Sequence, residues 1–258
     1  MSTISIEKKN GVHLIRLNRP DVLNSFNREM SLALQEALKS SGQDDACRVI
    51  ILSGTGRAFC AGQDLSEAIS PDGPGIKKIV EEHYNPIITL IRETPKPVLG
   101  MINGVAAGAG CNIALACDIT FAAEEVSFIQ AFSRIGLIPD SGGTFFLPRL
   151  VGMQRAAAYM FSGQKVGAKE AADMGMIYQC LPAAKLEETV LEYAVQLADM
   201  PTMAFAYTKR LLNLSMHNNL EGQLKEEGKY QELSSQTADH REGVMSFLEK
   251  RRAVFTGK

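Results

Sequence analysis

The sequence predicts an α/β protein with an α-helical C-terminal region. Up to Gly152, short apolar runs typical of strands alternate with helical patterns. Beyond Gly152 the pattern becomes helical and is punctuated by Gly163, Pro182 and Pro201, and no internal sequence repeat is evident. Alternating strands and helices are typical of a layered core, so we expect such a core followed by a helical tail.

The first elements are a strand, a helix and a second strand. Residues 12–17 alternate loosely between apolar and polar side chains and are followed by a turn sequence, which predicts a strand. Asn27 suits the N-cap of a helix, and the apolar side chains between residues 30 and 38 have helical spacing. A nearly continuous apolar run at residues 47–54 is closed by glycine and predicts a strand buried on both faces.

The middle of the chain begins with a loop. Residues 70–75 contain Pro and Gly, which predicts a mobile loop of the kind that often covers a site. The elements expected next are a helix at about residues 76–91, a buried strand at 97–102, a helix at 111–117 and a strand at 119–122.

Composition places the chain among ordinary globular proteins, with 45% hydrophobic and 22% charged residues in a length of 258. A formal charge of −2 lacks the basic excess of a nucleic-acid binder, so we expect no nucleic-acid partner. The five cysteines contain no C-x-x-C pair and the 4 histidines have no metal-ligand spacing, so reduced thiols and no metal are expected. No signal peptide or apolar run of ~20 residues is evident, which favours a cytoplasmic location without a membrane partner.

Two segments rich in small residues stand where a strand is expected to turn into a helix, at residues 59–65 and 103–112. Small side chains let a ligand approach the backbone, and N–H groups at a helix start are unpaired and carry partial positive charge. Either segment alone is more often tight packing than a site. Two such donors aimed at one point would form an oxyanion hole, which stabilises developing negative charge.

These two segments and the motifs around them resemble the crotonase family, also called the enoyl-CoA hydratase/isomerase superfamily. The resemblance spans nearly the whole chain and rests on several motifs in a fixed order. The motifs are Leu17-Asn18-Arg19-Pro20 with Leu23-Asn24, Ala58 to Leu65, Pro95-Lys96-Pro97-Val98, Asn103 to Asp118, Gly136 to Thr144, and Arg241-Glu242-Gly243 with Phe247 to Arg252.

The resemblance implies a repeated ββα spiral core, over residues 1–195, and a helical trimerisation region over residues 196–258. It also implies an acyl-CoA substrate whose thioester oxygen accepts hydrogen bonds from the backbone N–H groups of Gln63 and Ala109. Coenzyme A is then part of the substrate, and no separate cofactor is expected. The implied assembly is a homotrimer or a dimer of trimers, and other enzymes of phenylacetate degradation or β-oxidation are candidate partners.

The family pattern also implies contacts to coenzyme A and the acyl group. The residues at the matching positions are Val22, Leu23, Ala61, Asp64, Leu65, Gly108, Asn112 and Phe132. Phe247 and Lys250, from this or a neighbouring subunit, would flank the adenine and the phosphates. On the residues alone, Lys250 is equally well explained as the solvated basic end of a helix.

The family's hydratases use two glutamates as acid and base, and this chain has neither. The matching positions hold Asn112 and Phe132, whose side chains cannot exchange a proton usefully near pH 7. Asp140 lies in the Pro-Asp-Ser-Gly-Gly turn, where several family isomerases carry their acid, and is the expected catalytic residue. The same turn sequence also suits an Asp that only bonds the backbone. An apolar pocket that includes Phe132 could raise the pKa of Asp140 into a useful range.

A single carboxylate beside an oxyanion hole suits an allylic proton shift. The pattern most resembles the ring-opening isomerases of aerobic phenylacetate degradation. The expected activity is therefore isomerisation of 1,2-epoxyphenylacetyl-CoA to oxepin-CoA, a shift of the double bond from 3-enoyl-CoA to 2-enoyl-CoA, or both. Hydration, dehalogenation with Asp140 as nucleophile, and non-catalytic binding of acyl-CoA or RNA stay open as alternatives, although the near-neutral charge disfavours RNA.

Overall fold

The computed structural model describes residues 2–70 and 73–258, so the loop predicted at residues 70–75 lies partly outside the described residues. Its strands form two sheets. The larger sheet contains, in spatial order, β1 (Ile4–Lys9), β2 (Val12–Leu17), β3 (Val49–Gly54), β5 (Val98–Ile102), β7 (Ile119–Ala123) and β10 (Gln179–Leu181). The smaller sheet contains β4 (Ala58–Cys60), β6 (Val105–Ala107), β8 (Ser127–Ile129) and β9 (Lys165–Gly167). The α/β class predicted from the sequence is confirmed.

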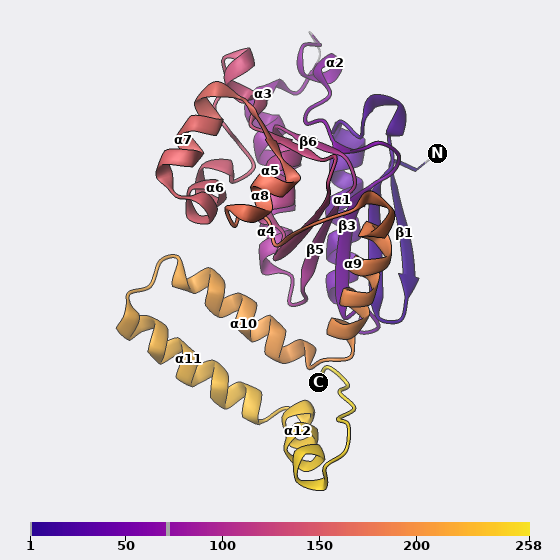
Figure 1. Ribbon diagram of the computed structural model, residues 1–258, viewed down its shortest axis with the longest axis vertical. Helices are drawn as coiled ribbons and strands as arrows, with labels where there is room; N and C mark the ends of the chain where they lie inside the picture. The colour runs from indigo at the N-terminus through magenta and orange to yellow at the C-terminus, as the bar shows by residue number, and fades with distance from the viewer. Residues whose placement is uncertain (1, 71–72) are drawn as a thin grey trace.

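The central strands alternate between the two sheets along the chain. The larger sheet receives β3, β5 and β7, and each is followed directly by a strand of the smaller sheet, β4, β6 or β8, before a helical segment begins. The pairings among these central strands are parallel, whereas β1 pairs with β2 and β8 with β9 in antiparallel register. This repeated ββα path is the predicted spiral core (Figure 1).

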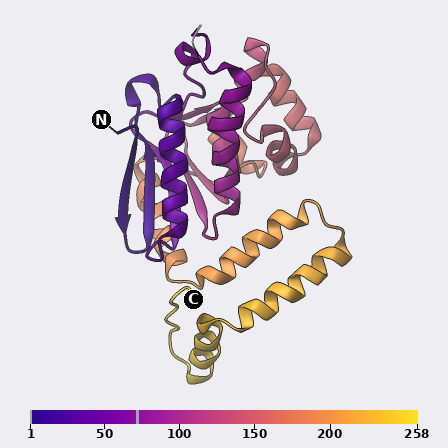
Figure 2. The same cartoon turned by 180° about the vertical axis from the view of Figure 1, so that it is seen from behind.

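Helices cover both faces of the larger sheet. On one face lie α1 (Arg28–Gln43) and α4 (Asn85–Glu93), and on the other lies α9 (Ala183–Ala198) (Figures 1 and 2). The predicted N-cap of α1 is confirmed, because the Asn27 side chain accepts a hydrogen bond of 3.0 Å from the Met30 backbone. Burial by helices on both faces explains why every residue of β3 and β5 is buried.

The remaining core helices are short and lie between strands. They are η1 (Pro20–Val22), α2 (Leu65–Ala68), α3 (Gly75–Lys78), the π-helical η2 (Ile79–Tyr84), α5 (Ala109–Ala116), the 3-10 helix η3 (Ala131–Ile135), α6 (Gly143–Val151), α7 (Met153–Ser162) and α8 (Ala168–Asp173). The helix expected at residues 76–91 is built from α3, η2 and α4 in succession. The helix expected at residues 111–117 begins earlier, at Ala109, so Ala109 contributes a helix-start N–H.

The sequence missed the short strands. Strands such as β4, β6 and β8 contain three residues each, too few to show a two-residue periodicity. The expectation of purely helical structure beyond Gly152 is wrong at β9 and β10. These strands are also three residues long, and pairing with β8 and β7 rather than local pattern makes them strands.

The C-terminal helices α10 (Thr202–Ser215), α11 (Leu220–Ser235) and α12 (Ala238–Glu249) extend away from the core (Figure 1). Lys209 of α10 anchors them: its buried ammonium group donates to the Ile91 carbonyl at 2.7 Å and pairs with Asp118 at 2.7 Å. The boundary predicted between residues 195 and 196 falls inside α9, and the division into two domains stays a prediction.

Several large apolar side chains of this region are exposed in the single chain. They are Leu212, Leu220, Leu224, Val244, Met245, Phe247 and Leu248. A contact between copies of the chain would cover such side chains, as the predicted trimer requires, and the trimer stays a prediction. Among the described residues, no helix is long and apolar enough to cross a membrane.

Candidate active site

Two glycine turns meet at the edge of the smaller sheet. Gly62 follows β4 and Gly108 follows β6, and their φ angles of +101° and +53° lie in the region that favours glycine. A Cβ atom on Gly108 would lie 3.9 Å from the Gly62 Cα, and one on Gly62 would lie 3.9 Å from the Ala109 nitrogen. The turns that the sequence singled out are therefore in contact, and we call them the turn pair.

The backbone of Gln63 is held by a parallel bridge to Phe26. The Phe26 N–H donates to the Gly62 carbonyl at 2.7 Å, and the Asp64 N–H donates to the Phe26 carbonyl at 2.8 Å. In a parallel bridge the central residue directs its own N–H and C=O away from the partner strand. The N–H of Gln63 therefore points away from Phe26.

The turn pair offers two backbone donors. Ala109 is the first residue of α5, so its N–H has no acceptor within the helix. Neither the Gln63 N–H nor the Ala109 N–H donates to another group within residues 2–70 and 73–258. Two unbonded N–H groups beside one another, one of them at a helix start, can stabilise an oxygen that gains negative charge.

Asp140 lies in the turn between η3 and α6 and is half-buried. The Ser141 hydroxyl donates to Asp140 Oδ1 at 2.8 Å, and the Asn112 side chain donates to the Asp140 carbonyl at 2.8 Å. Burial raises the pKa of Asp140, and the Ser141 hydrogen bond opposes part of that rise. A carboxyl group with a raised pKa can exchange protons closer to neutral pH than an exposed aspartate can.

Tyr84 is bonded to the first turn of the turn pair. Its hydroxyl donates to the Gln63 side-chain oxygen at 2.6 Å. Burial is the main cause of the raised pKa of Tyr84, with smaller contributions from Cys60, Asp140 and Glu67, so the phenol stays protonated and can donate this hydrogen bond. Sequence reasoning missed Tyr84, because nothing in the helical pattern around it distinguishes it from a core aromatic residue.

Asn112 and Phe132 stand at the positions that the resemblance gives to the two hydratase glutamates, and both lie beside the Gly108 turn. Asn112 is fully buried, and its oxygen accepts a hydrogen bond of 2.6 Å from Gln130 while its nitrogen supports Asp140. Both of its amide atoms are thus engaged by the protein. The Phe132 ring lies against the turn pair, because a Cβ atom on Gly108 would be 3.8 Å from its Cζ.

The residues expected at the coenzyme A end lie beside the first turn. The Ala61 N–H donates to the Leu23 carbonyl at 3.0 Å, which joins the segment at Val22 and Leu23 to the turn at Gly62. Val22 and Leu65 are exposed there, with 44% and 55% of their surface accessible.

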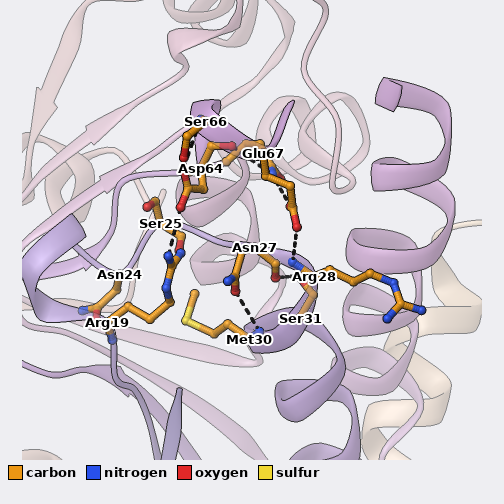
Figure 3. Close-up of polar contacts among 12 residues, drawn as sticks. Arg19, Asn24, Ser25, Asn27, Arg28, Met30, Ser31, Asp64, Ser66 and Glu67 are labelled. Atoms are coloured by element: carbon orange, nitrogen blue, oxygen red, sulfur yellow. Dashed lines mark hydrogen bonds and ion pairs between the residues drawn. The ribbon is translucent and has the colours of Figure 1, made fainter. Parts of the chain in front are cut away.

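The side chain of Asp64 is occupied by the protein. It caps α2 by accepting from the Ser66 backbone at 3.1 Å and pairs with Arg19 at 3.0 Å (Figure 3). The hydrogen bonds from Ser66 and the contact with Arg19 lower the pKa of Asp64. Asp64 can therefore offer a ligand its backbone more readily than its carboxylate.

Phe247 and Lys250 are not brought to the turn pair within one chain. Phe247 is 83% exposed on α12, Lys250 is the C-cap of that helix, and α12 lies at the opposite end of the molecule from α2 (Figure 1). A role for these two residues at the site requires a second copy of the chain.

Burial suppresses the reactivity of the cysteine thiols near the site. Burial raises the pKa values of the Cys60 and Cys111 thiols to about 12 each, so neither forms a nucleophilic thiolate near neutral pH. Within the described residues, no cluster of three or more His, Cys, Asp or Glu side chains could hold a metal ion.

The chain matches known proteins over nearly its whole length. The family model for enoyl-CoA hydratase/isomerase matches residues 7–258. The 1,2-epoxyphenylacetyl-CoA isomerase of Escherichia coli (strain K12) is 44% identical over 261 residues, covering 100% of both chains. A Rhodobacter capsulatus protein named "probable enoyl-CoA hydratase" is also 44% identical, covering 99% of this chain and 98% of its own length.

A solved structure shows the same fold. The enoyl-CoA hydratase from Bacillus anthracis superimposes with a TM-score of 0.92 at 32% identity, and the match covers 99% of this chain and 100% of that one. The match over nearly the full length of both chains confirms the crotonase fold and the resemblance found in the motifs. The chain therefore belongs to the enoyl-CoA hydratase/isomerase, or crotonase, family of enzymes.

Proposed function

We propose that the chain is an acyl-CoA isomerase in which Asp140 moves a proton and the turn pair holds the enolate. The observation that carries the proposal is a half-buried carboxyl group of raised pKa, on a turn bonded to Asn112 of the helix that begins at Ala109, while Asn112 and Phe132 occupy the hydratase glutamate positions. One proton-transfer group suffices for an isomerisation. Activation of water by a pair of glutamates is not available from those positions.

In the proposed reaction, the Asp140 carboxylate removes a proton from C2 of a 3-enoyl-CoA. The electron pair delocalises onto the thioester oxygen, where the N–H groups of Gln63 and Ala109 stabilise the negative charge. Asp140, now protonated, returns the proton to C4, and the double bond moves to C2. Atoms and charge balance without a cofactor, because coenzyme A enters as part of the substrate.

The proposed substrates are 3-enoyl-CoA thioesters and 1,2-epoxyphenylacetyl-CoA, which would become oxepin-CoA. The 44% identity to the E. coli isomerase over the full chain supports the second substrate. The backbone near Val22, Leu23, Ala61 and Asp64 would hold the pantetheine and the nucleotide. The exposed side chain of Leu65 and the Gly108 turn would border the thioester.

The test is conversion of cis-3-hexenoyl-CoA by wild-type protein and by Asp140→Asn, with products identified by mass spectrometry. Isomerisation leaves the mass unchanged, whereas hydration adds one water. We expect Asp140→Asn to lower kcat by about 1000-fold, within the range reported for loss of a general acid or base. An Asp140→Asn variant that isomerises cis-3-hexenoyl-CoA at the wild-type rate would contradict the proposal.

Thermal unfolding is the control for this variant. Because burial raises the folded-state pKa of Asp140, ionisation near neutral pH costs the folded state free energy that a neutral Asn does not cost. The Tm of Asp140→Asn should therefore equal or exceed that of the wild type at pH 7. A lower Tm together with lost activity would indicate damage to the fold instead of loss of the proton carrier.

A further inference from the structure

The side chain of Gln63 is bonded at both ends of its amide group. The Tyr84 hydroxyl donates to Gln63 Oε1 at 2.6 Å, and Gln63 Nε2 donates to Glu67 Oε2 at 3.0 Å. A carboxylate can only accept, and it engages the amide nitrogen, so the oxygen must face the phenol. The amide therefore has one orientation in which both hydrogen bonds form.

Glu67 is itself held in place. Its other carboxylate oxygen accepts a hydrogen bond of 2.9 Å from the backbone N–H of Arg28, the first residue of α1 (Figure 3). The start of a helix of 16 residues carries partial positive charge and favours a carboxylate there. Glu67 thus links the Gln63 side chain by hydrogen bonds to the start of α1.

Tyr84 is fixed by packing. It is 1% exposed and lies edge-on to Phe26, with ring centroids 5.7 Å apart. Phe26 also supplies the two backbone hydrogen bonds that flank Gln63. Tyr84 ends the π-helical segment η2, and such segments are frequent at functional sites. The main chain and the side chain of Gln63 are therefore held by residues that pack against each other.

We propose that Tyr84 and Glu67 are positioning residues that fix the direction of the Gln63 N–H before the substrate binds. That N–H belongs to the Gly62–Gln63 peptide, whose carbonyl is bonded to the Phe26 N–H. Gly62 leaves this peptide conformationally permissive on one side. The hydrogen bonds from the Gln63 side chain to Tyr84 and Glu67 fix the position of the Gln63 Cα, and this restrains the Gly62–Gln63 peptide at its other end. A preorganised donor needs no reorientation when charge develops on the thioester oxygen.

The proposal rests on the oxyanion role of Gln63 in the proposed function, and the first test is steady-state kinetics. Tyr84→Phe removes only the hydroxyl, and we expect kcat to fall about 10-fold with KM within about 2-fold, less than the ~100-fold loss of a whole oxyanion donor. Glu67→Ala should act in the same direction. The matched control is Tyr159→Phe, which removes a hydrogen bond of 3.0 Å between α7 and Glu170 of α8, helices that carry no residue assigned to the site, and it should leave kcat unchanged.

A double-mutant cycle shows whether Tyr84 acts through Gln63. Gln63→Ala keeps the backbone N–H but removes the side chain that Tyr84 and Glu67 hold. In the Gln63→Ala background, Tyr84→Phe should lower kcat no further, because its target is already gone. An equal loss in both backgrounds, or no loss in either, would overturn the positioning role.

A spectroscopic measurement separates the positioning role from the reaction itself. We would record the infrared carbonyl stretch of hexanoyl-CoA, carbon-13 labelled at the thioester, bound to each variant. Hydrogen bonds from the turn pair polarise the carbonyl and lower its stretching frequency. Tyr84→Phe should weaken this shift, whereas Asp140→Asn and Tyr159→Phe should keep the wild-type shift.

The outcomes distinguish the two proposals. A wild-type protein that shifts the carbonyl stretch but isomerises no enoyl-CoA contradicts the proposed function alone, and the effect of Tyr84→Phe on the shift then supports or overturns the positioning role. An active isomerase in which Tyr84→Phe alters neither kcat nor the shift contradicts the positioning role alone.

Discussion

In the proposed mechanism, the turn pair and the Asp140 turn contribute to the same site in different ways. The turn pair offers two main-chain N–H groups whose directions depend on a β-bridge, a helix start and the positive φ angles of Gly62 and Gly108. The Asp140 turn offers one side chain whose reactivity depends on burial and on its neighbours. Backbone donors would serve any reaction that passes through a thioester enolate. In the proposed mechanism, the Asp140 side chain selects which reaction follows.

This difference predicts which substitutions each region tolerates. The N–H groups of the turn pair survive most side-chain changes and are lost only when the backbone changes conformation. Asp140 depends on its own carboxylate and on the hydrogen bonds that support it. The three predictions below test this contrast, beginning with the largest expected effect.

Gly108→Ala should lower kcat/KM about 100-fold, which is the scale of losing one oxyanion donor. The added methyl group has room, since its nearest neighbours would be 3.8 Å and 3.9 Å away. The backbone of Gly108, at φ +53° and ψ −127°, is strained for any residue with a Cβ. We therefore expect the Gly108–Ala109 peptide to rotate, which would turn the Ala109 N–H away from the thioester oxygen.

Gly152→Ala is the matched control for that substitution. Gly152 also has a positive φ, +80°, and a Cβ there would meet nothing within 4 Å. Both variants should lose stability by about 1–3 kcal/mol through backbone strain, and only Gly108→Ala should lose activity. Equal activity of the two variants in the cis-3-hexenoyl-CoA assay would show that the conformation at Gly108 does not matter for the reaction.

Asn112→Ala should lower kcat about 10-fold by releasing the Asp140 turn. The substitution removes the donor to the Asp140 carbonyl and the acceptor of Gln130, so stability should also fall by about 1–3 kcal/mol. Thr120→Val is the control, because it removes another buried hydrogen bond of α5, to the Ala114 carbonyl, away from Asp140. If both variants lose stability and neither loses kcat, Asn112 has no part in placing Asp140.

Ser141→Ala should move the acidic limb of the pH profile of kcat to higher pH. Asp140 must be ionised to remove a proton, so activity is lost as pH falls through its raised pKa. The Ser141 hydroxyl stabilises the ionised form, and its loss raises that pKa further. A limb that stays in place or moves to lower pH would show that another group controls it.

The sequence predicted the elements whose conformation is set by residues close together in the chain. The strands β2, β3, β5 and β7 have apolar runs long enough to recognise, and the N-cap of α1 is a local pattern. The three-residue strands of the smaller sheet were missed because pairing with their neighbours decides their conformation.

The turn pair was also readable from the sequence, because small residues and glycine at a strand-to-helix turn leave backbone donors accessible whatever surrounds them. The absence of carboxylates at positions 112 and 132 was equally plain. Together with the other motifs in their fixed order, the turn segments indicated the family, and the family pattern gave the residues at positions 112 and 132 their meaning, which disfavours water activation by paired glutamates.

Only the tertiary structure decided how the site is supported. Gln63 and Tyr84 are 21 residues apart and Asn112 and Asp140 are 28 apart, so their contacts depend on how whole helices pack. The raised pKa of Asp140 likewise comes from burial by distant segments. The chain's local chemistry supplies the donors and the carboxyl group, while long-range packing sets their direction and their charge, because neither property belongs to a residue in isolation.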